Sequence, residues 1–166
     1  STPREIRWQQ PHLEIAGPPL VAPDPRVRRT TRQDMAQLYP ACVAMYTEEV
    51  GLSPETGGSG DLYRARVTQL VSRGWSFARF DEDRLVFKAE VACASPAAAQ
   101  IQGVWVPPER RGEGLAESGM AAVVDIVRRE IAPTVSLYVN EWNEPARRAY
   151  RAVGFAETAR FSTIMF

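Results

Sequence analysis

The stretch that most constrains the fold and function of this chain runs from Val104 to Ala116. An apolar segment stops at Pro107 and Pro108, two arginines and two glycines follow, and a helical pattern then begins. Glycine lets a backbone adopt positive φ and come close to a ligand, and the first N–H groups of a helix have no partner within the helix. The helix dipole also favours an anion at that end. This order of strand, basic turn and helix predicts a binding site for phosphate groups.

The turn from Arg111 to Ala116 differs from two common nucleotide-binding motifs. A P-loop requires Lys and then Ser or Thr after its glycines, and no lysine follows here. A dinucleotide fingerprint requires a third glycine where this chain has Glu117. Kinase and dehydrogenase functions are therefore disfavoured. A tight strand–helix connection without a ligand remains the plain structural alternative.

Composition narrows the class of protein further. The 166 residues suit one domain with a sizeable core, and 20 basic against 20 acidic residues give zero formal net charge. This balance argues against a nucleic-acid-binding protein that acts through a broad basic surface. No apolar run approaches the roughly 18 residues of a membrane span, and no signal-peptide pattern is visible. We expect a cytoplasmic protein without a nucleic-acid or membrane partner.

Histidine-based and metal-based chemistry are also disfavoured. The only histidine is His12, in a proline-containing leader. Cys42 and Cys93 stand in apolar surroundings without the spacing of metal ligands, so we expect buried free thiols, with a disulfide as the alternative. The sequence therefore predicts no metal site.

Residues 1–25 differ from the rest of the chain because six prolines interrupt any helix and disfavour a strand. We interpret them as a proline-rich linker or N-terminal arm, cut from a longer polypeptide. The alternative is a strand or arm packed on the domain. Residues 26–166 are predicted to form one domain.

Hydrophobic periodicity predicts a mixed order of elements in that domain. The predicted strands are 27–31, 75–80, 84–94, 100–106 and 134–139, with one or two more over 155–166, and the predicted helices are 33–50, 61–73, 115–132 and 143–153. Residues 81–83 are predicted to form a hairpin turn. A hairpin followed by a strand–helix–strand–helix–strand tail favours one α/β or α+β domain around a central mixed sheet.

A second motif spans Asn143 to Phe155. Asn143 is a good N-cap, and a proline two residues later suits the first turn of a helix. The spacing of Ala146, Tyr150 and Val153 places them on one face of that helix. Taken alone, the motif predicts a core tyrosine.

Together the two motifs resemble the GCN5-related N-acetyltransferase (GNAT) family. They read V-x-V-P-P-E-x-R-G-x-G-x-A and N-x-x-A-x-x-x-Y-x-x-x-G-F, and the turn is similar to the family's Arg/Gln-x-x-Gly-x-Gly/Ala element through Arg111, Gly114 and Ala116. The resemblance covers roughly residues 26–166. It implies an acyl-CoA N-acyltransferase fold, in which helices flank a mostly antiparallel sheet with splayed central strands. Residues 102–106 and 161–166 also resemble a subgroup of two-domain actinobacterial proteins, which implies a further N-terminal domain.

The ligand implied by this resemblance is acetyl-CoA, whose acetyl group would pass directly to an amine. The cofactor-binding residues that it implies are Val104, Trp105 and Val106 for the pantetheine arm, Arg111, Gly112, Glu113, Gly114, Leu115 and Ala116 for the pyrophosphate, and Asn143 for the cofactor arm. Tyr150 would protonate the departing CoA thiolate, because a phenol with a pKa of about 10 keeps its proton at neutral pH.

The general base is left open by the resemblance. Many family members carry a glutamate on the V-x-V strand, where this chain has Gln100 and Gln102, and an amide cannot take the proton. Glu90, amid apolar residues of the neighbouring strand, is the candidate base, with a structural partner of Lys88 or an arginine as the plain alternative. Glu141 and a water-relayed path are the other possibilities.

The acceptor amine is not predicted, and neither is the oligomeric state. Glu48 and Glu49 lie where the family lines its acceptor site, so they are either an attraction for a cationic amine or a solvated helix end. Two functions stay open for the chain. One is an acetyl-CoA-dependent N-acetyltransferase, with a longer acyl donor as a variant. The other is an acyl-CoA-binding regulatory or interaction module with little catalysis.

Overall fold

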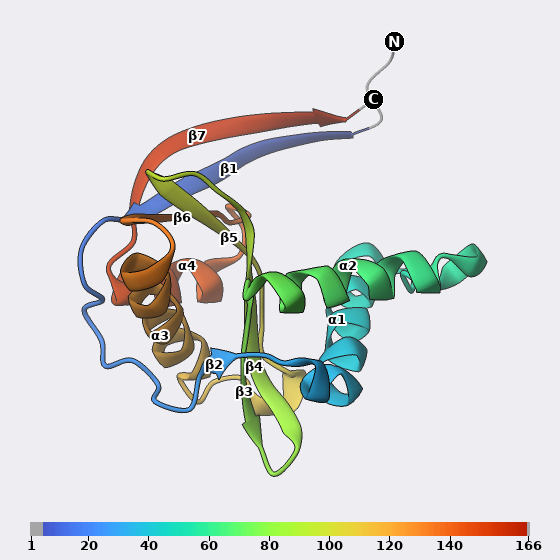
Figure 1. Cartoon of the computed structure of the whole chain (residues 1–166). Coiled ribbons are helices and arrows are strands. Elements are labelled where there is room, and N and C mark those ends of the chain that lie inside the picture. Colours follow the sequence, from blue (N-terminus) through green and yellow to red (C-terminus); the bar gives the residue numbers. More distant parts are fainter. Residues whose placement is uncertain (1–4, 166) are drawn as a thin grey trace.

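The computed structural model describes residues 5–165, with side chains for residues 10–158. Within them, one sheet has the strand order β2-β3-β4-β5-β6-β1-β7. The strands are β1 (Glu5–Ile15), β2 (Arg28–Arg29), β3 (Ser76–Asp81), β4 (Arg84–Ala94), β5 (Ala98–Trp105), β6 (Thr134–Tyr138) and β7 (Ala156–Met165). The longer helices are α1 (Met35–Val50), α2 (Gly60–Arg73), α3 (Leu115–Glu130) and α4 (Glu144–Val153). Figure 1 shows α1 and α2 on one face of the sheet and α3 and α4 on the other.

The predicted fold class is confirmed. In the described sheet every neighbouring pair of strands is antiparallel except β5 and β6, which run parallel. The predicted hairpin between β3 and β4 is present, with Glu82 and Asp83 at φ 49° and 65°. Positive φ at both central residues matches the right-handed twist of the two strands, so this turn continues the sheet without splaying it.

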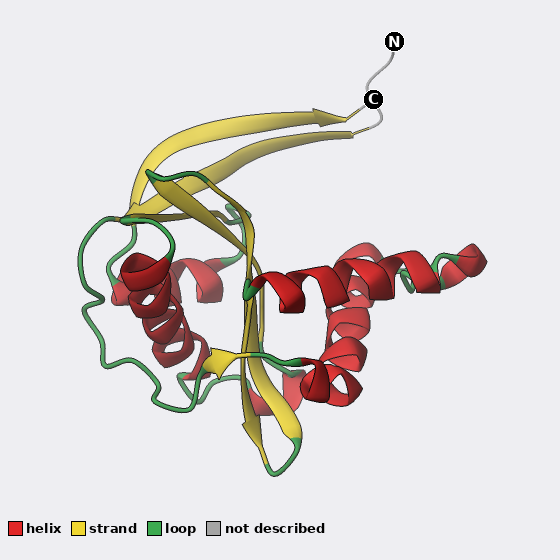
Figure 2. Ribbon diagram, viewed as in Figure 1, coloured by secondary structure: helices red, strands yellow, loops and turns green. Residues whose placement is uncertain are grey.

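The interpretation of residues 1–25 as a linker or arm needs correction, because residues 5–15 form β1 inside the sheet. This strand lies between β6 and β7, with His12 opposite Tyr138 of β6 and Ala159 of β7. Pro11 lacks an N–H, but its carbonyl still joins the sheet by accepting a hydrogen bond from the Val139 N–H at 3.2 Å. Figure 2 shows β1 and β7 curving away together as a two-stranded ribbon. The strand alternative describes this segment better.

Residues 16–26 form a strap that crosses α4 and α3, and it contains Pro18, Pro19, Pro23 and Pro25. The Leu20 N–H donates to the Val153 carbonyl at 2.8 Å, and the Asp24 N–H donates to the Ser118 carbonyl at 2.9 Å. The buried carboxylate of Asp24 also binds Arg79 of β3 at 2.9 Å. Extended backbone of this kind suits proline because it needs few of its own N–H donors.

Alternation along the strands creates one apolar core on each face of the sheet. The core beneath α3 and α4 includes Phe87, Ala89, Val91, Met120, Val124, Val127, Tyr150 and Val153. The smaller core beneath α1 and α2 includes Leu38, Cys42, Val67, Val71 and Ala78. Both cysteines are free, as expected, but only Cys42 is buried, and Cys93 is exposed near the end of β4.

Gly119 is where α3 comes closest to the sheet. A Cβ atom on Gly119 would lie 2.7 Å from Cδ2 and Cε2 of Phe87, which is fully buried. We predict that Gly119→Ala lowers the free energy of unfolding by about 1–3 kcal/mol through overpacking, although alanine favours a helix by about 1 kcal/mol. Urea denaturation measures the change. The same substitution in a Phe87→Leu background should cost less, and an equal cost in both backgrounds would contradict the packing explanation.

Candidate active site

The centre of the sheet opens where β5 and β6 part. Their four paired positions run from Ala98 opposite Thr134 to Ile101 opposite Leu137. Strand β5 continues to Trp105, whereas β6 ends at Tyr138. On its other side β5 stays paired with β4 as far as Trp105. One edge of β5 beyond Ile101 therefore has no partner on β6 and is placed to pair with an extended ligand.

Strand β5 carries a bulge on its opposite edge, where it pairs with β4. Glu90 and Lys88 of β4, two residues apart, lie opposite Gln102 and Trp105, which are three apart. The stretch of β5 with the extra residue contains Gly103, whose φ is +62°. A Cβ atom there would lie 2.9 Å from Oε1 of Glu90 and 3.0 Å from Nζ of Lys88. Glycine is required at this position both by the backbone conformation and by the two side chains against it.

Glu90, the predicted base, belongs to a largely buried polar cluster on the α1 side of the bulge. Its Oε2 accepts from the amide Nε2 of Gln102 at 2.8 Å, and its Oε1 lies 3.4 Å from Nζ of Lys88. The Glu90 side chain is 13% exposed, whereas that of Lys88 is 1% exposed. The predicted alternative, in which Glu90 pairs with Lys88, is thus observed in the structure. It does not exclude a base role, because each carboxylate oxygen has a second lone pair.

The predicted phosphate-binding turn joins β5 to α3. A short 3-10 helix (Pro108–Arg110) is followed by Gly112 and Gly114 at φ 85° and 79°. Neither glycine has another atom within 4 Å of where a Cβ would stand, so the backbone of the turn faces open space. The first N–H groups of α3, from Leu115 onward, follow directly. The turn can therefore present several backbone donors to an anion.

Both arginines of the turn are already paired with carboxylates. Arg111 donates from Nη2 to Oε1 and Oε2 of Glu48 at 2.9 and 3.0 Å and from Nε to the Val106 carbonyl at 2.9 Å. Glu48 also accepts from the indole Nε1 of Trp105 at 3.3 Å. Arg110 binds Glu113 at 3.0 Å within the turn. Glu48, at the end of α1, is therefore fastened to the turn and to β5.

Helix α4 supplies Tyr150 from the other side of the sheet. Asn143 caps this helix by accepting from the Ala146 N–H at 3.3 Å, as the sequence predicts. The Tyr150 ring is buried and packs edge-on against Phe155 with centroids 5.9 Å apart. Burial raises the pKa of the Tyr150 hydroxyl well above its usual range, and the negative charge of Glu49 on α1 adds to the rise. Tyr150 is therefore a protonated donor at neutral pH.

A cavity of about 340 Å³ lies between the end of α1 and the start of α2. Tyr46, Leu52 and Tyr63 are among its walls. The Tyr63 hydroxyl donates to the Cys42 carbonyl at 2.9 Å, and burial, then Cys42 and Glu90, raise the pKa of Tyr63. This cavity is thus within electrostatic reach of Glu90.

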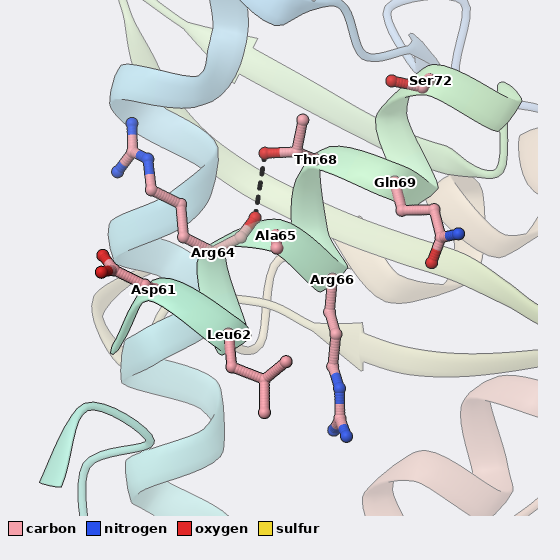
Figure 3. Close-up of a pocket in the computed structure, with 8 residues that line it drawn as sticks. All are labelled: Asp61, Leu62, Arg64, Ala65, Arg66, Thr68, Gln69 and Ser72. Atoms are coloured by element: carbon pink, nitrogen blue, oxygen red, sulfur yellow. Dashed lines mark hydrogen bonds between the residues drawn. The ribbon is translucent and has the colours of Figure 1, made fainter. Parts of the chain in front are cut away.

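A wider depression of about 680 Å³ follows the outward face of α2 (Figure 3). All of its lining residues belong to α2, and within it the Thr68 hydroxyl donates to the Arg64 carbonyl at 2.9 Å. Because no second element closes over it, this depression offers no enclosed site. The smaller cavity is the better candidate for an acceptor.

The structure therefore brings Glu90, Val104 to Val106, the glycine turn and Glu48 to one end of β5. Sequence reasoning missed Lys88 and Gly103 as site residues. The signal for Lys88 was a lysine inside the apolar run Leu85 to Val91. Gly103 carried no such signal, because its neighbours come from the other strand.

Two further observations concern the described residues alone. Within residues 5–165, no three His, Cys, Asp or Glu side chains are grouped as a metal site would require. None of the helices in the same range has the length and apolar character of a membrane span.

Comparison with known protein families adds to this geometry. Residues 74–155 match the family model described as "Acetyltransferase (GNAT) family", and this range contains Glu90, the glycine turn and Tyr150. Residues 1–38 match a different model, "Domain of unknown function (DUF4081)". No curated protein sequence matches the chain.

Solved structures show the fold directly. An acetyltransferase from the GNAT family of Colwellia psychrerythraea superposes with a TM-score of 0.73 at 14% identity, over 99% of this chain and 58% of that one. The chain has the GNAT fold. A putative GNAT acetyltransferase from Novosphingobium aromaticivorans gives 0.66 at 22% identity, over 99% and 68%. A predicted acetyltransferase with acetyl-CoA from Clostridium acetobutylicum gives 0.62 at 16%, over 81% and 92%. Residues 74–155 are thus similar to the GNAT acetyltransferase family, and these solved structures show the shared fold.

The boundary predicted at residue 25 coincides with neither family match. The first match ends at residue 38, inside α1, and the second begins at residue 74, before β3. The chain also spans 58% of the length of the Colwellia relative.

The buried state of Tyr150 can be tested in alkaline titration. Because its pKa is raised in the folded protein, we predict that Tyr150→Phe removes one of the late-ionising tyrosines and leaves early phenolate absorbance at 295 nm unchanged. The stability linked to this group is full below the ordinary tyrosine pKa of about 10 and falls as the pH rises beyond it. The variant should therefore lose less stability between pH 10 and 11 than the wild type. Loss of an early-ionising tyrosine would contradict the prediction.

Proposed function

We propose that this domain is an N-acetyltransferase that moves the acetyl group of acetyl-CoA directly to an amine. One observation carries the proposal: the unpaired edge of β5 leads into a glycine turn, with Glu90 on one side of the sheet and Tyr150 on the other. The GNAT family match and the fold support it. A structural relative that holds acetyl-CoA is consistent with the same donor here.

The residues present suit acetyl-CoA. Backbone groups of Val104, Trp105 and Val106 would bind the amide-rich pantetheine arm as a strand binds its neighbour. The N–H groups of the turn from Arg111 to Ala116 would bind the pyrophosphate, since two positive-φ glycines leave that backbone uncovered. The side-chain oxygen of Asn143 is taken by its cap, which leaves its amide nitrogen for the cofactor arm.

The chemistry follows from the same residues. The amine nitrogen attacks the thioester carbon, and the carbonyl oxygen becomes an oxyanion that a backbone N–H of β5 stabilises. The carbon–sulfur bond then breaks, the thiolate takes the proton of the Tyr150 hydroxyl, and the amine proton passes to Glu90 directly or through water. The amide product and CoA thiol leave, Glu90 releases its proton to solvent, and solvent returns a proton to Tyr150. Glu141 and a water relay without a single base remain the alternatives to Glu90.

The acceptor would approach from the cavity between α1 and α2. Its aromatic wall, Tyr46 and Tyr63, leads toward the Glu90 cluster. Glu49 lies near enough for its charge to act on Tyr150, so a protonated amine gains attraction as it enters. The pairing of Glu48 with Arg111 directs that carboxylate toward the cofactor turn instead. We therefore assign the attraction of the acceptor to Glu49.

We also propose that the domain is the C-terminal part of a two-domain protein, of the actinobacterial subgroup that residues 102–106 and 161–166 resemble. The match of residues 1–38 to a separate family model supports this arrangement.

The central test combines binding with turnover. We expect calorimetry to show acetyl-CoA binding, and we expect Tyr150→Phe to keep that affinity while lowering kcat for an acceptor amine by about 10²–10⁴-fold, because the thiolate loses its proton donor. Phenylalanine preserves the packing against Phe155, so a thermal melt checks the fold. Absence of binding at millimolar acetyl-CoA would refute the proposal.

The regulatory-module alternative predicts a different result. In that case acetyl-CoA binds, but neither the wild type nor Tyr150→Phe acetylates any amine in a broad panel of small amines, peptides and aminoglycosides. Unchanged kcat in Tyr150→Phe would instead keep the enzyme and remove Tyr150 from its chemistry.

The glycine turn can be tested with a matched glycine elsewhere. Gly114→Ala forces a side chain into φ +79°, which costs about 1–2 kcal/mol for an L-residue. We predict that it weakens CoA binding by about tenfold, because the turn must shift. Gly17→Ala is the control, since Gly17 has open space around it and no positive φ. Equal affinity of the two variants for CoA would exclude the turn as the pyrophosphate site.

A further inference from the structure

Lys88 is an unusual residue for its position. It stands in the middle of β4 with 1% of its side chain exposed, on the face covered by α1. Its ammonium group has three hydrogens and three acceptors: the Gly103 carbonyl at 2.6 Å, Oε1 of Glu90 at 3.4 Å and Sδ of Met45 at 3.4 Å. A buried charge with this complete set of partners is held in one orientation.

The shortest of these contacts ends on the bulge of β5. The Gly103 carbonyl belongs to the same peptide group as the Val104 N–H. This peptide is trans, so its C=O and N–H point in opposite directions. With the carbonyl fixed on Lys88, the N–H points away from Lys88. A cation on the carbonyl also draws electron density from the peptide and makes that N–H a stronger donor.

We propose that Lys88 is a positioning residue of the active site, which polarises the Gly103–Val104 peptide and orients Glu90. This inference rests on the proposed acetyl transfer. Through the peptide, Lys88 strengthens the Val104 N–H as the donor to the oxyanion. Through Oε1, it fixes the orientation of one oxygen of Glu90.

The surroundings of Glu90 make Lys88 its one cationic neighbour in the described cluster. From β5 the neutral amide of Gln102 donates to Glu90 at 2.8 Å. From α1 the Cys42 thiol and from α2 the Tyr63 hydroxyl are close enough to interact with it electrostatically, and burial raises the pKa of both groups, so both are neutral at pH 7. Removing the ammonium therefore leaves the carboxylate without a compensating charge.

The test is Lys88→Met, which keeps an unbranched, buried side chain of nearly the same length but removes the ammonium group and its hydrogen bonds. We expect the KM for acetyl-CoA to stay within about twofold and kcat to fall by about 10–100-fold, because one oxyanion donor is weakened rather than lost. An unchanged kcat, or a loss confined to KM, would overturn the proposal.

A second pair of variants protects against misfolding of the single variant. Glu90→Gln and the double variant Lys88→Met/Glu90→Gln leave no unpaired buried charge on Glu90. If Lys88 also acts through the Gly103 carbonyl, the double variant is about tenfold slower than Glu90→Gln alone. Equal rates would overturn the route through the peptide.

Failure of the proposed function is separable from failure of this inference. If the wild type neither binds acetyl-CoA nor acetylates an amine, the proposed function fails. The effect of Lys88 on its two contacts can then be measured by NMR, which does not require the protein to turn over a substrate. We expect Lys88→Met to shift the ¹⁵N resonance of Val104 upfield and to change the chemical shift of the Glu90 side-chain carboxyl carbon. If neither resonance changes, Lys88 acts on neither the Val104 peptide nor Glu90.

Discussion

Hydrogen bonding between β5 and β6 stops after four residue pairs, and the rest of the candidate site depends on this early end. The two strands are parallel, so α3 must connect them and begins at the same end of the sheet as the opening. The N-terminal end of α3 and the free edge of β5 are therefore neighbours by topology. Ligands of open α/β sheets commonly bind at the carboxyl ends of strands for this reason.

The bulge on the opposite edge of β5 completes this arrangement. A register shift between Lys88 and Glu90 gives β5 an extra residue, and Gly103 absorbs it at positive φ. The same shift moves the ion pair of β4 against the backbone of β5. One edge of the strand is thus open for a ligand while the other is held by a buried charge. Strand β5 is thus held by β4 and Lys88 along one edge, and its other edge is left unpaired for the donor.

Most of this fold could be predicted from local patterns, and its exceptions have a common cause. The hairpin, α3 and the capped helix from Asn143 follow from periodicity, turns and caps, all of which act between residues near in sequence. Strand β1 could not be predicted in this way, because its partners β6 and β7 are more than a hundred residues away in sequence. Pro11 also made a strand look unfavourable there. A strand is recognised poorly when its stability comes from distant neighbours.

The candidate site divides in the same way. The glycine turn and Tyr150 are visible as motifs because each is contiguous in sequence. The placement of Glu90 beside Gln102 depends on the register of two strands, and the pairing of Glu48 with Arg111 joins residues 63 positions apart. Glu90 of β4 can thus supply, beside Gln102, the carboxylate that β5 itself lacks. Only the register of the two strands reveals this, because neither residue stands out in the sequence.

The charges of the turn explain how a chain without net charge can still suit an anionic ligand. Arg110 and Arg111 are both neutralised by carboxylates, Glu113 and Glu48, in the structure. The Arg111–Glu48 pair is 46% and 45% exposed, and exposed pairs contribute only about 0–1 kcal/mol. A pyrophosphate offers Arg111 more charge and also meets the N–H groups of α3, which no carboxylate of the chain occupies in the described hydrogen bonds. Exchange of Glu48 for pyrophosphate on Arg111 would therefore be inexpensive, and it would leave Glu48 with Trp105 beside the open edge of β5. Under the proposed function, donor binding would thus add negative potential on the side from which a cationic acceptor arrives.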